Sequence, residues 1–510
     1  MSYDSQENRI LSLEISLKDI MLATENFSVN CFGSGRYWKA YEGKLPNAST
    51  TIVAKRWDSK SDDQFGTELD ILFKRKHKNI IRLVGYCSER NENIIVYEHM
   101  SKGSLDKYLK DSKLKWMKRL QICIDVASAL DFLHGENVTL KKVVHRNIKS
   151  HSILLNDDWD AKISNFELSS LDSSHQNIKY INKDAYLDPQ YNQGSLTEKS
   201  DIYSFGVILF EILCGRLTWE EGHEAGPLAK HYYEQAKLDE MVFADIKEQI
   251  VPQSLTTFVD IAYECLHEDA DKRPKAGDVV IQLKKALEIQ EDFELWEPKL
   301  PRDYKEIMGL SQTPEIYHTK QKKDLYEKLS GGILLPKEKV WFILSDNGES
   351  NKMISATAAK FTYKNHQQSH KFRSIHISRF QKVAKILDIS NLKIQVSADN
   401  RLLSPDVTYG IYLVFKISDP RIFSRNCMFM NLKYKNGPET LHSYFATWRD
   451  NDWMMIELHR FLNHKEDVSF TFLLESFSRY YCTSGAIFIE GIEFQAIKNA
   501  SLKYTPWFSF

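Results

Sequence analysis

The stretch 143–155, VVHRNIKSHSILL, constrains this chain more than any other part of its sequence. Its last three residues, Ile153, Leu154 and Leu155, form a short apolar run that predicts a buried strand. A second run, AKISNFEL at 161–168, follows it closely. Together the two stretches decide which fold and which chemistry are open to the chain.

The stretch 143–155 resembles the catalytic loop of eukaryotic protein kinases, and 161–168 resembles the metal-binding Asp-Phe-Gly segment that follows such a loop. The resemblance implies four catalytic positions, held here by Asn147, Lys149, Ser152 and Asn165. The family has Asp in place of Asn147 and Asn165, and Asn in place of Ser152. An amide does not accept a proton at neutral pH, and magnesium prefers anionic oxygen. We therefore expect no catalytic base and a poorly held Mg²⁺.

The glycine of the Asp-Phe-Gly segment is replaced by Glu167. The family requires glycine there for backbone freedom, so we expect Glu167 to restrict the backbone. Its carboxylate also lies close in sequence to the lost one. A metal captured by Glu167 from an unusual angle is the alternative that would keep the chain active.

Two glycines in CFGSGRYWKAYEGKL, at 31–45, predict a hairpin whose backbone can approach phosphates. Lys55 follows 20 residues after the second glycine, and the resemblance makes Glu68 its partner. Trp38 replaces a third glycine and would crowd a nucleotide, so we expect ATP to bind weakly. The resemblance implies nine nucleotide-binding positions: Gly33, Gly35, Ala40, Ala54, Lys55, Glu68, Tyr97, Glu98 and Met100.

Residues 196–216, LTEKSDIYSFGVILFEILCGR, predict a buried helix capped by Ser200 or Asp201. The segment resembles plant receptor-like kinases, in which the residue at Asp201 supports the catalytic loop. The resemblance also implies that Arg273 has lost its ion pair, because the family's glutamate is Gln190 here.

Two further segments follow the kinase pattern. Residues 104–134 predict a long amphipathic helical region, and 169–185 resemble an activation loop with Lys183 in place of Ser or Thr. The resemblance covers about residues 12–290 and implies an α+β, two-lobed protein kinase fold.

The composition of the 510 residues is that of an ordinary globular protein, too long for one hydrophobic core. A formal net charge of −1 gives no field to attract nucleic acid. The seven scattered cysteines favour a reducing compartment, and no apolar run is long enough for a transmembrane segment. We expect a cytoplasmic protein, with peripheral attachment to the plasma membrane as an alternative.

Beyond a charged, proline-bearing connector at 291–332, with a short helix at 322–329, the hydrophobic period changes to two. Residues 392–396, 428–434 and 468–474 alternate between apolar and polar side chains, which predicts an all-β antiparallel sandwich. Four pieces of 333–498, among them LSPDVTYGIYLVFKI and NDWMMIELHRF, resemble the phloem protein 2 lectins, a jelly-roll-like family.

That resemblance implies binding of N-acetylglucosamine-type glycans through stacked tryptophan and carboxylates. Trp341 and Glu457 are the candidates by position, whereas the family's further tryptophans, near Phe361, are not matched. Three hypotheses remain for the whole chain. It is a signalling pseudokinase that binds protein partners such as an active receptor kinase, an active Ser/Thr kinase, or a lectin with a structural kinase fold.

Overall fold

The computed structural model divides the chain into two compact units, Met1–Glu291 and Asp292–Phe510. It describes residues 13–28, 31–46, 50–135, 141–171, 185–193, 196–217, 233, 238–311, 321–335, 339–358, 360–363, 370–387, 392–398, 402–417, 428–436, 438–449, 452–464, 468–479 and 487–497. Within these residues, no helix combines the length and the apolar character needed to cross a membrane.

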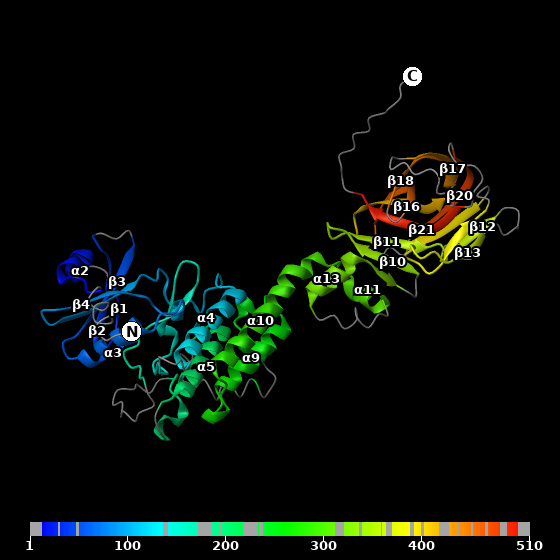
Figure 1. The fold of residues 1–510 in the computed structure, drawn as a ribbon. Coiled ribbons are helices and arrows are strands. Elements are labelled where there is room, and N and C mark those ends of the chain that lie inside the picture. Colours follow the sequence, from blue (N-terminus) through cyan, green and yellow to red (C-terminus); the bar gives the residue numbers. More distant parts are fainter. Residues whose placement is uncertain are drawn as a thin grey trace. The chain divides into compact units, whose positions relative to one another are not determined.

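The first unit begins with a five-stranded antiparallel sheet in the order β1-β2-β3-β5-β4 (Figure 1). Its strands are β1 (Cys31–Ser34), β2 (Trp38–Lys44), β3 (Thr51–Trp57), β4 (Leu83–Glu89) and β5 (Glu92–Glu98). Side chains alternate along β3, so Val53 and Trp57 enter the larger core. Ile52 and Ala54 point the other way, into a cluster with α2 (Leu17–Ala23). Helix α3 (Asp62–Lys74) packs on β4 and β5.

Helices dominate the rest of the first unit, and α5 packs against α4 and α9 (Figure 1). Their bounds are α4 (Trp116–His134), α5 (Glu198–Cys214), α7 (Leu238–Met241), α8 (Ala244–Lys247), α9 (Pro252–Cys265) and α10 (Ala276–Trp296). A small sheet joins β6 (Gly103–Ser104), β7 (Ile153–Leu155) and β8 (Ala161–Ile163). The strand predicted at 153–155 is therefore β7, with Ile153 and Leu155 fully buried.

Two predictions about helix starts are wrong. The region expected from Ser104 becomes helical only at Trp116, because a 3₁₀ turn, η2 (Leu105–Tyr108), and a loop come first. The N-cap of α5 is Thr197, whose hydroxyl accepts from the backbone N–H of Lys199. Ser200 lies one turn inside, and its hydroxyl accepts from the N–H of Thr197 to complete a capping box.

The end of α10 reaches into the second unit, and the next α-helices described there are α11 (Tyr304–Ser311) and α13 (Lys322–Gly331). The second of these matches the helix expected at 322–329. The segment expected as a connector, 291–332, is partly folded into the second unit. It places five buried apolar side chains in the core of the second unit: Leu300, Tyr304, Ile307, Leu325 and Leu329.

Hydrogen bonds join the strands of the second unit into one antiparallel sheet of 13 described strands. Their order is β12-β15-β20-β17-β18-β19-β16-β21-β11-β10-β9, with β13 and β14 attached beside β21. Phe342 of β10 and Ile394 of β15, from opposite ends of this order, belong to the same core, so the sheet folds over on itself. The antiparallel sandwich predicted from the period of two is confirmed.

The bounds of these strands are β9 (Ile333–Leu335), β10 (Val340–Leu344), β11 (Ser350–Ser355), β12 (Lys360–Tyr363), β13 (His370–Arg373), β14 (Val383–Ile386), β15 (Leu392–Ala398), β16 (Thr408–Ile417), β17 (Met428–Asn436), β18 (Glu439–Trp448), β19 (Met454–Leu462), β20 (Val468–Arg479) and β21 (Ile487–Ala496). The three alternating runs seen in the sequence correspond to β15, β17 and β20.

Candidate functional site

A cavity of about 780 Å³ in the first unit brings together most of the residues predicted from the sequence. Ala54 is a wrong prediction, because it points away from the cavity on β3 while its neighbours Val53 and Lys55 line it. Ser152 is fully buried and does not line it either. The predicted residues that do line it are Gly33, Gly35, Ala40, Lys55, Glu68, Tyr97, Glu98, Met100, Asn147, Lys149 and Asn165.

Lys55 of β3 and Glu68 of α3 form a buried ion pair, with 2.7 Å between Nζ and Oε2. The hydroxyl of Tyr97 donates to the other carboxylate oxygen of Glu68 at 2.8 Å. Burial raises the pKa of Glu68, Lys55 opposes that shift, and Glu167 adds to it. Burial also raises the pKa of Tyr97, which keeps its hydroxyl a donor. The pairing predicted for Lys55 and Glu68 is confirmed.

Glu167 reaches into the same site. Its Oε2 lies 3.3 Å from Lys55 Nζ, and its Oε1 accepts from the Asn147 side-chain amide at 3.4 Å. The Asn165 Oδ1 also accepts from Lys55, at 3.4 Å. One ammonium therefore serves two carboxylates, and Glu167 links β3 to the catalytic loop.

The expected backbone strain at Glu167 is absent. The left-handed residue of this segment is Asn165, with a φ of 67°, and Glu167 is not among the residues with positive φ. Asparagine tolerates this conformation better than most residues do. Glu167 therefore does not impose the backbone strain that was expected from the replacement of glycine.

Two indole rings enclose the ammonium of Lys55. Trp38 and Trp57 are directly opposed on β2 and β3, and Lys55 Nζ lies 4.5 Å from each ring centroid. The Trp38 ring lies against the glycine loop, since a Cβ added to Gly35 would be 2.5 Å from its Nε1. Sequence reasoning missed Trp57, although the period of two from Val53 through Lys55 indicated it.

Asp201 holds the catalytic loop as predicted. Its carboxylate accepts from the backbone N–H groups of His145 and Arg146, both at 2.8 Å. The Ser152 hydroxyl donates to the carbonyl of Asn147 at 2.8 Å, inside the loop. Burial lowers the pKa of His145, whose Nε2 lies 3.0 Å from the carbonyl of Ser164. These hydrogen bonds fix the conformation of the loop.

The residues present do not fit a metal-bound triphosphate. Magnesium needs several oxygen ligands in near-octahedral geometry. Asn165 Oδ1 already accepts from Lys55, and Ser152 is buried with its hydroxyl directed at Asn147. Among the described residues, no group of three or more His, Cys, Asp or Glu side chains is arranged to hold a metal ion. Glu167 also forms an ion pair with Lys55, the residue that would bind phosphate.

The predicted loss of the Arg273 ion pair is wrong. Arg273 donates from Nη1 and Nη2 to the two carboxylate oxygens of Asp188, at 2.7 and 2.9 Å. Ser200 also donates to Asp188, at 2.8 Å. Asp188 lies two residues before Gln190, so a different acid from the same loop supplies the charge. Of the activation loop expected at 169–185, residues 172–184, with Lys183, lie outside the described residues.

The two candidate sugar-binding residues of the second unit lie in one row of cross-strand partners. The row runs from Trp341 through Met353, Glu493 and Tyr412 to Glu457. Four strand spacings separate its ends, about 19 Å. Trp341 and Glu457 therefore do not meet at one sugar ring.

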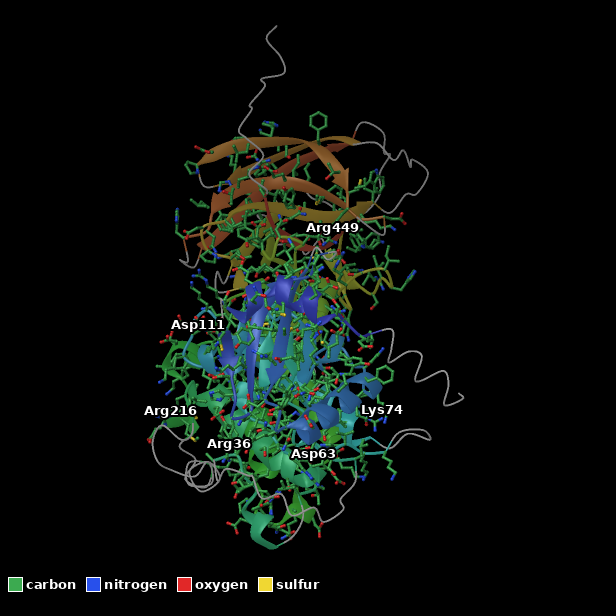
Figure 2. All side chains as sticks on the ribbon, turned by 90° about the vertical axis from the view of Figure 1, so that its left-hand side faces the viewer. Arg36, Asp63, Lys74, Asp111, Arg216 and Arg449 are labelled. Atoms are coloured by element: carbon green, nitrogen blue, oxygen red, sulfur yellow. The ribbon has the colours of Figure 1, made fainter. Side chains whose placement is uncertain are left out.

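Trp341 is half-buried and packs on Gly332, where a Cβ would lie 2.6 Å from its ring. Glu457 is more open. It accepts from the Tyr412 hydroxyl at 3.2 Å and from the Arg460 guanidinium at 2.6 and 2.9 Å. Glu493, between them, is held by Arg449 (Figure 2) at 2.5 and 2.6 Å. The side chain of Phe361 lies outside the described residues.

Comparison with known proteins finds a matching family for each of the two units. Residues 28–283 match the family of protein tyrosine and serine/threonine kinases, and residues 349–496 match phloem protein 2. The receptor-like protein kinase FERONIA of Arabidopsis thaliana is 36% identical over 311 residues, which cover 58% of this chain and 34% of FERONIA. HERK 1 from the same plant is 37% identical over 287 residues, 53% of this chain and 34% of HERK 1. The chain spans about a third of the length of these relatives.

Proposed function

The chain belongs to the protein tyrosine and serine/threonine kinase family and carries a phloem protein 2 domain, and from this premise we propose that it is a signalling pseudokinase. Its first unit binds other proteins and does not transfer phosphate. The observation that carries the proposal is the set of contacts around Lys55, which pairs with Glu68 and Glu167 while Asn147 and Asn165 hold the positions of the two family aspartates.

The lost groups are those that phosphoryl transfer needs most. Kinases work by positioning and by neutralising charge with metal ions. The Asn147 amide cannot take the proton of an attacking hydroxyl, and positioned acid–base help is typically worth about 10²–10⁴-fold in rate. Glu167 is no ready substitute for a metal ligand, because Lys55 and Asn147 already bind its two oxygens.

The groups that hold the fold together are kept. Asp201 fixes the catalytic loop, Lys55 pairs with Glu68, and Arg273 pairs with Asp188. A kinase-shaped surface without turnover suits a partner in a signalling complex. Several relatives are named receptor-like protein kinases, so an active receptor kinase is the partner we propose. We place the protein in the cytoplasm, where the five described cysteines would stay reduced.

We expect the purified chain of 510 residues to show no magnesium-dependent phosphorylation of itself or of a generic protein substrate. The measurement is transfer of radiolabelled phosphate from ATP over hours. Lys55→Ala serves as the matched control, and wild type and variant should give the same background. Transfer by the wild type that Lys55→Ala abolishes would establish an active kinase and overturn the proposal.

For the second unit we propose binding of N-acetylglucosamine oligosaccharides, supported by the match to phloem protein 2 and by the half-exposed Glu457 beside Tyr412 and Arg460. A hydrogen bond to a charged group contributes about 1.5–3 kcal/mol. We therefore expect Glu457→Gln to weaken binding about tenfold or more in calorimetric titrations of the full chain. The control is Glu439→Gln, at the exposed first residue of β18, which should bind as the wild type does. Equal affinity for non-acetylated oligosaccharides would argue against the assignment.

A further inference from the structure

We propose that the cavity of the first unit takes uncharged, planar heteroaromatic molecules and discriminates against their phosphorylated forms, because the Glu167 carboxylate occupies the anion position on Lys55. The inference rests on the proposed function, in which this cavity does not transfer phosphate. It goes further by naming the class of ligand that the same cavity accepts.

The charges around Lys55 oppose an anionic ligand. Its ammonium contacts the carboxylates of Glu68 and Glu167, at 2.7 and 3.3 Å, so the three groups together carry a net negative charge when both acids are ionised. A phosphate placed there would meet one lysine that is already neutralised. It would also displace the Asn147 amide from Glu167.

The other side chains that line the cavity do not offset this negative charge. Five Lys or Arg and six Asp or Glu side chains line the whole cavity, so with His151 neutral it has no excess of positive charge. The basic residues are Arg36, Lys55, Lys107, Arg146 and Lys149, and the acidic ones are Glu68, Glu98, Asp106, Glu167, Asp188 and Asp201.

Aromatic rings cover the ammonium as well. Trp38 and Trp57 each bring a ring centroid within 4.5 Å of Lys55 Nζ, and Trp38 lies against Gly35. A phosphate that approached between the glycine loop and Lys55 would have to move the Trp38 indole. The position is therefore closed to phosphate by shape as well as by charge.

The cavity also has an apolar lining that suits a flat ligand. Its apolar lining comes from several strands and the segment after β5: Ala40, Val53, Ile81, Tyr97, Met100 and Leu154. A volume of about 780 Å³ is within the range of sites that enclose drug-sized molecules. An uncharged heterocycle gains this burial and needs no contact with Lys55, whereas its triphosphate would compete with the Glu68 and Glu167 carboxylates for that lysine.

The test compares one heterocycle with and without phosphates: adenosine, AMP, ADP and ATP are titrated into the full chain by calorimetry, with excess magnesium and with EDTA. We expect wild-type affinity to fall along this series, with adenosine at least about tenfold tighter than ATP and no gain from magnesium. We expect Glu167→Gln to raise the affinity for ATP about tenfold relative to the affinity for adenosine.

Asp63→Asn is the matched control, because Asp63 is exposed in the first turn of α3 (Figure 2) and does not line the cavity. Trp38→Gly is a second variant that should also favour ATP, so the conclusion does not depend on one substitution. The inference is overturned if wild type prefers ATP, if it binds neither molecule, or if neither variant changes the ratio of affinities. None of these outcomes bears on phosphate transfer, which alone decides the proposed function.

Discussion

Phosphate transfer should return only when five residues are changed together: Asn147→Asp, Ser152→Asn, Asn165→Asp, Glu167→Gly and Trp38→Gly. We expect this variant to phosphorylate a generic substrate about 10²–10⁴-fold faster than wild type. A positioned acid–base group usually contributes a factor of this size. The first three substitutions restore the base and the metal ligands. The last two free Lys55 and the glycine loop for phosphate.

The first three substitutions alone should fall well short, because Glu167 would then face new carboxylates. Its Oε1 is now 3.4 Å from the Asn147 amide nitrogen, and a carboxylate at that position would replace attraction by repulsion. A carboxylate in place of Asn165 would be the third around Lys55. Two like charges about 4 Å apart interact with about 4 kcal/mol at an effective dielectric constant of 20.

The rates are compared by initial velocities with magnesium–ATP in excess, after each variant is shown to unfold at a temperature close to that of wild type. Lys55→Ala in the background of all five substitutions is the control and should remove the gained activity. If the threefold variant were as fast as the fivefold one, Glu167 and Trp38 would not obstruct the site.

The parts of this fold that sequence reasoning captured are those in which local pattern and spacing decide the outcome. The run at 153–155 is β7, the alternating runs are strands, and Asp201 supports the catalytic loop. Lys55 of β3 and Glu68 of α3 meet, as the resemblance to the kinase family implies. The positions of the catalytic loop and the glycine loop followed from the same resemblance.

The remaining features depend on which side chains meet in three dimensions. Gln190 was expected to leave Arg273 without a partner, yet Asp188 in the same loop reaches the guanidinium. Glu167 was expected to strain the backbone, yet Asn165 takes the positive φ and Glu167 turns to Lys55. Neither outcome could be predicted from the identity of Gln190 or Glu167 alone.

Other errors did have a signal in the sequence. The period of two along β3 assigns Val53, and not Ala54, to the same face as Lys55. In the segment expected as a connector, Tyr304 and Ile307 are three residues apart and Leu325 and Leu329 are four apart. This is the spacing of one buried helix face. Both patterns are short, and charged neighbours obscured them.

The ion pair between Asp188 and Arg273 should contribute strongly to the stability of the first unit. Both side chains are almost fully buried, at 3% and 0% exposure, and removal of one partner from a buried pair costs about 3–5 kcal/mol. We expect Asp188→Ala to lower the free energy of unfolding of this unit by that amount at pH 7. Hydrogen exchange of peptides from α5 and α9 of the full chain, followed across a urea series, measures it.

The pH dependence of that loss separates the ion pair from simple packing. Burial would raise the pKa of Asp188, but the hydrogen bonds and charge of Arg273, together with hydrogen bonds from the backbone N–H of Gln190 and the Ser200 hydroxyl, outweigh it and hold the pKa below its ordinary value. The pair therefore stabilises the fold above the pKa of an unfolded aspartate, about 3.9, and loses its effect as the pH falls through the lower folded value. The difference between wild type and Asp188→Ala should be constant from pH 7 to 5 and shrink below about pH 4. Gln190→Ala, in the same loop, should change stability by less than about 0.5 kcal/mol at either pH. An equal loss from Gln190→Ala, or a difference for Asp188→Ala that persists in acid, would contradict the role given to this pair.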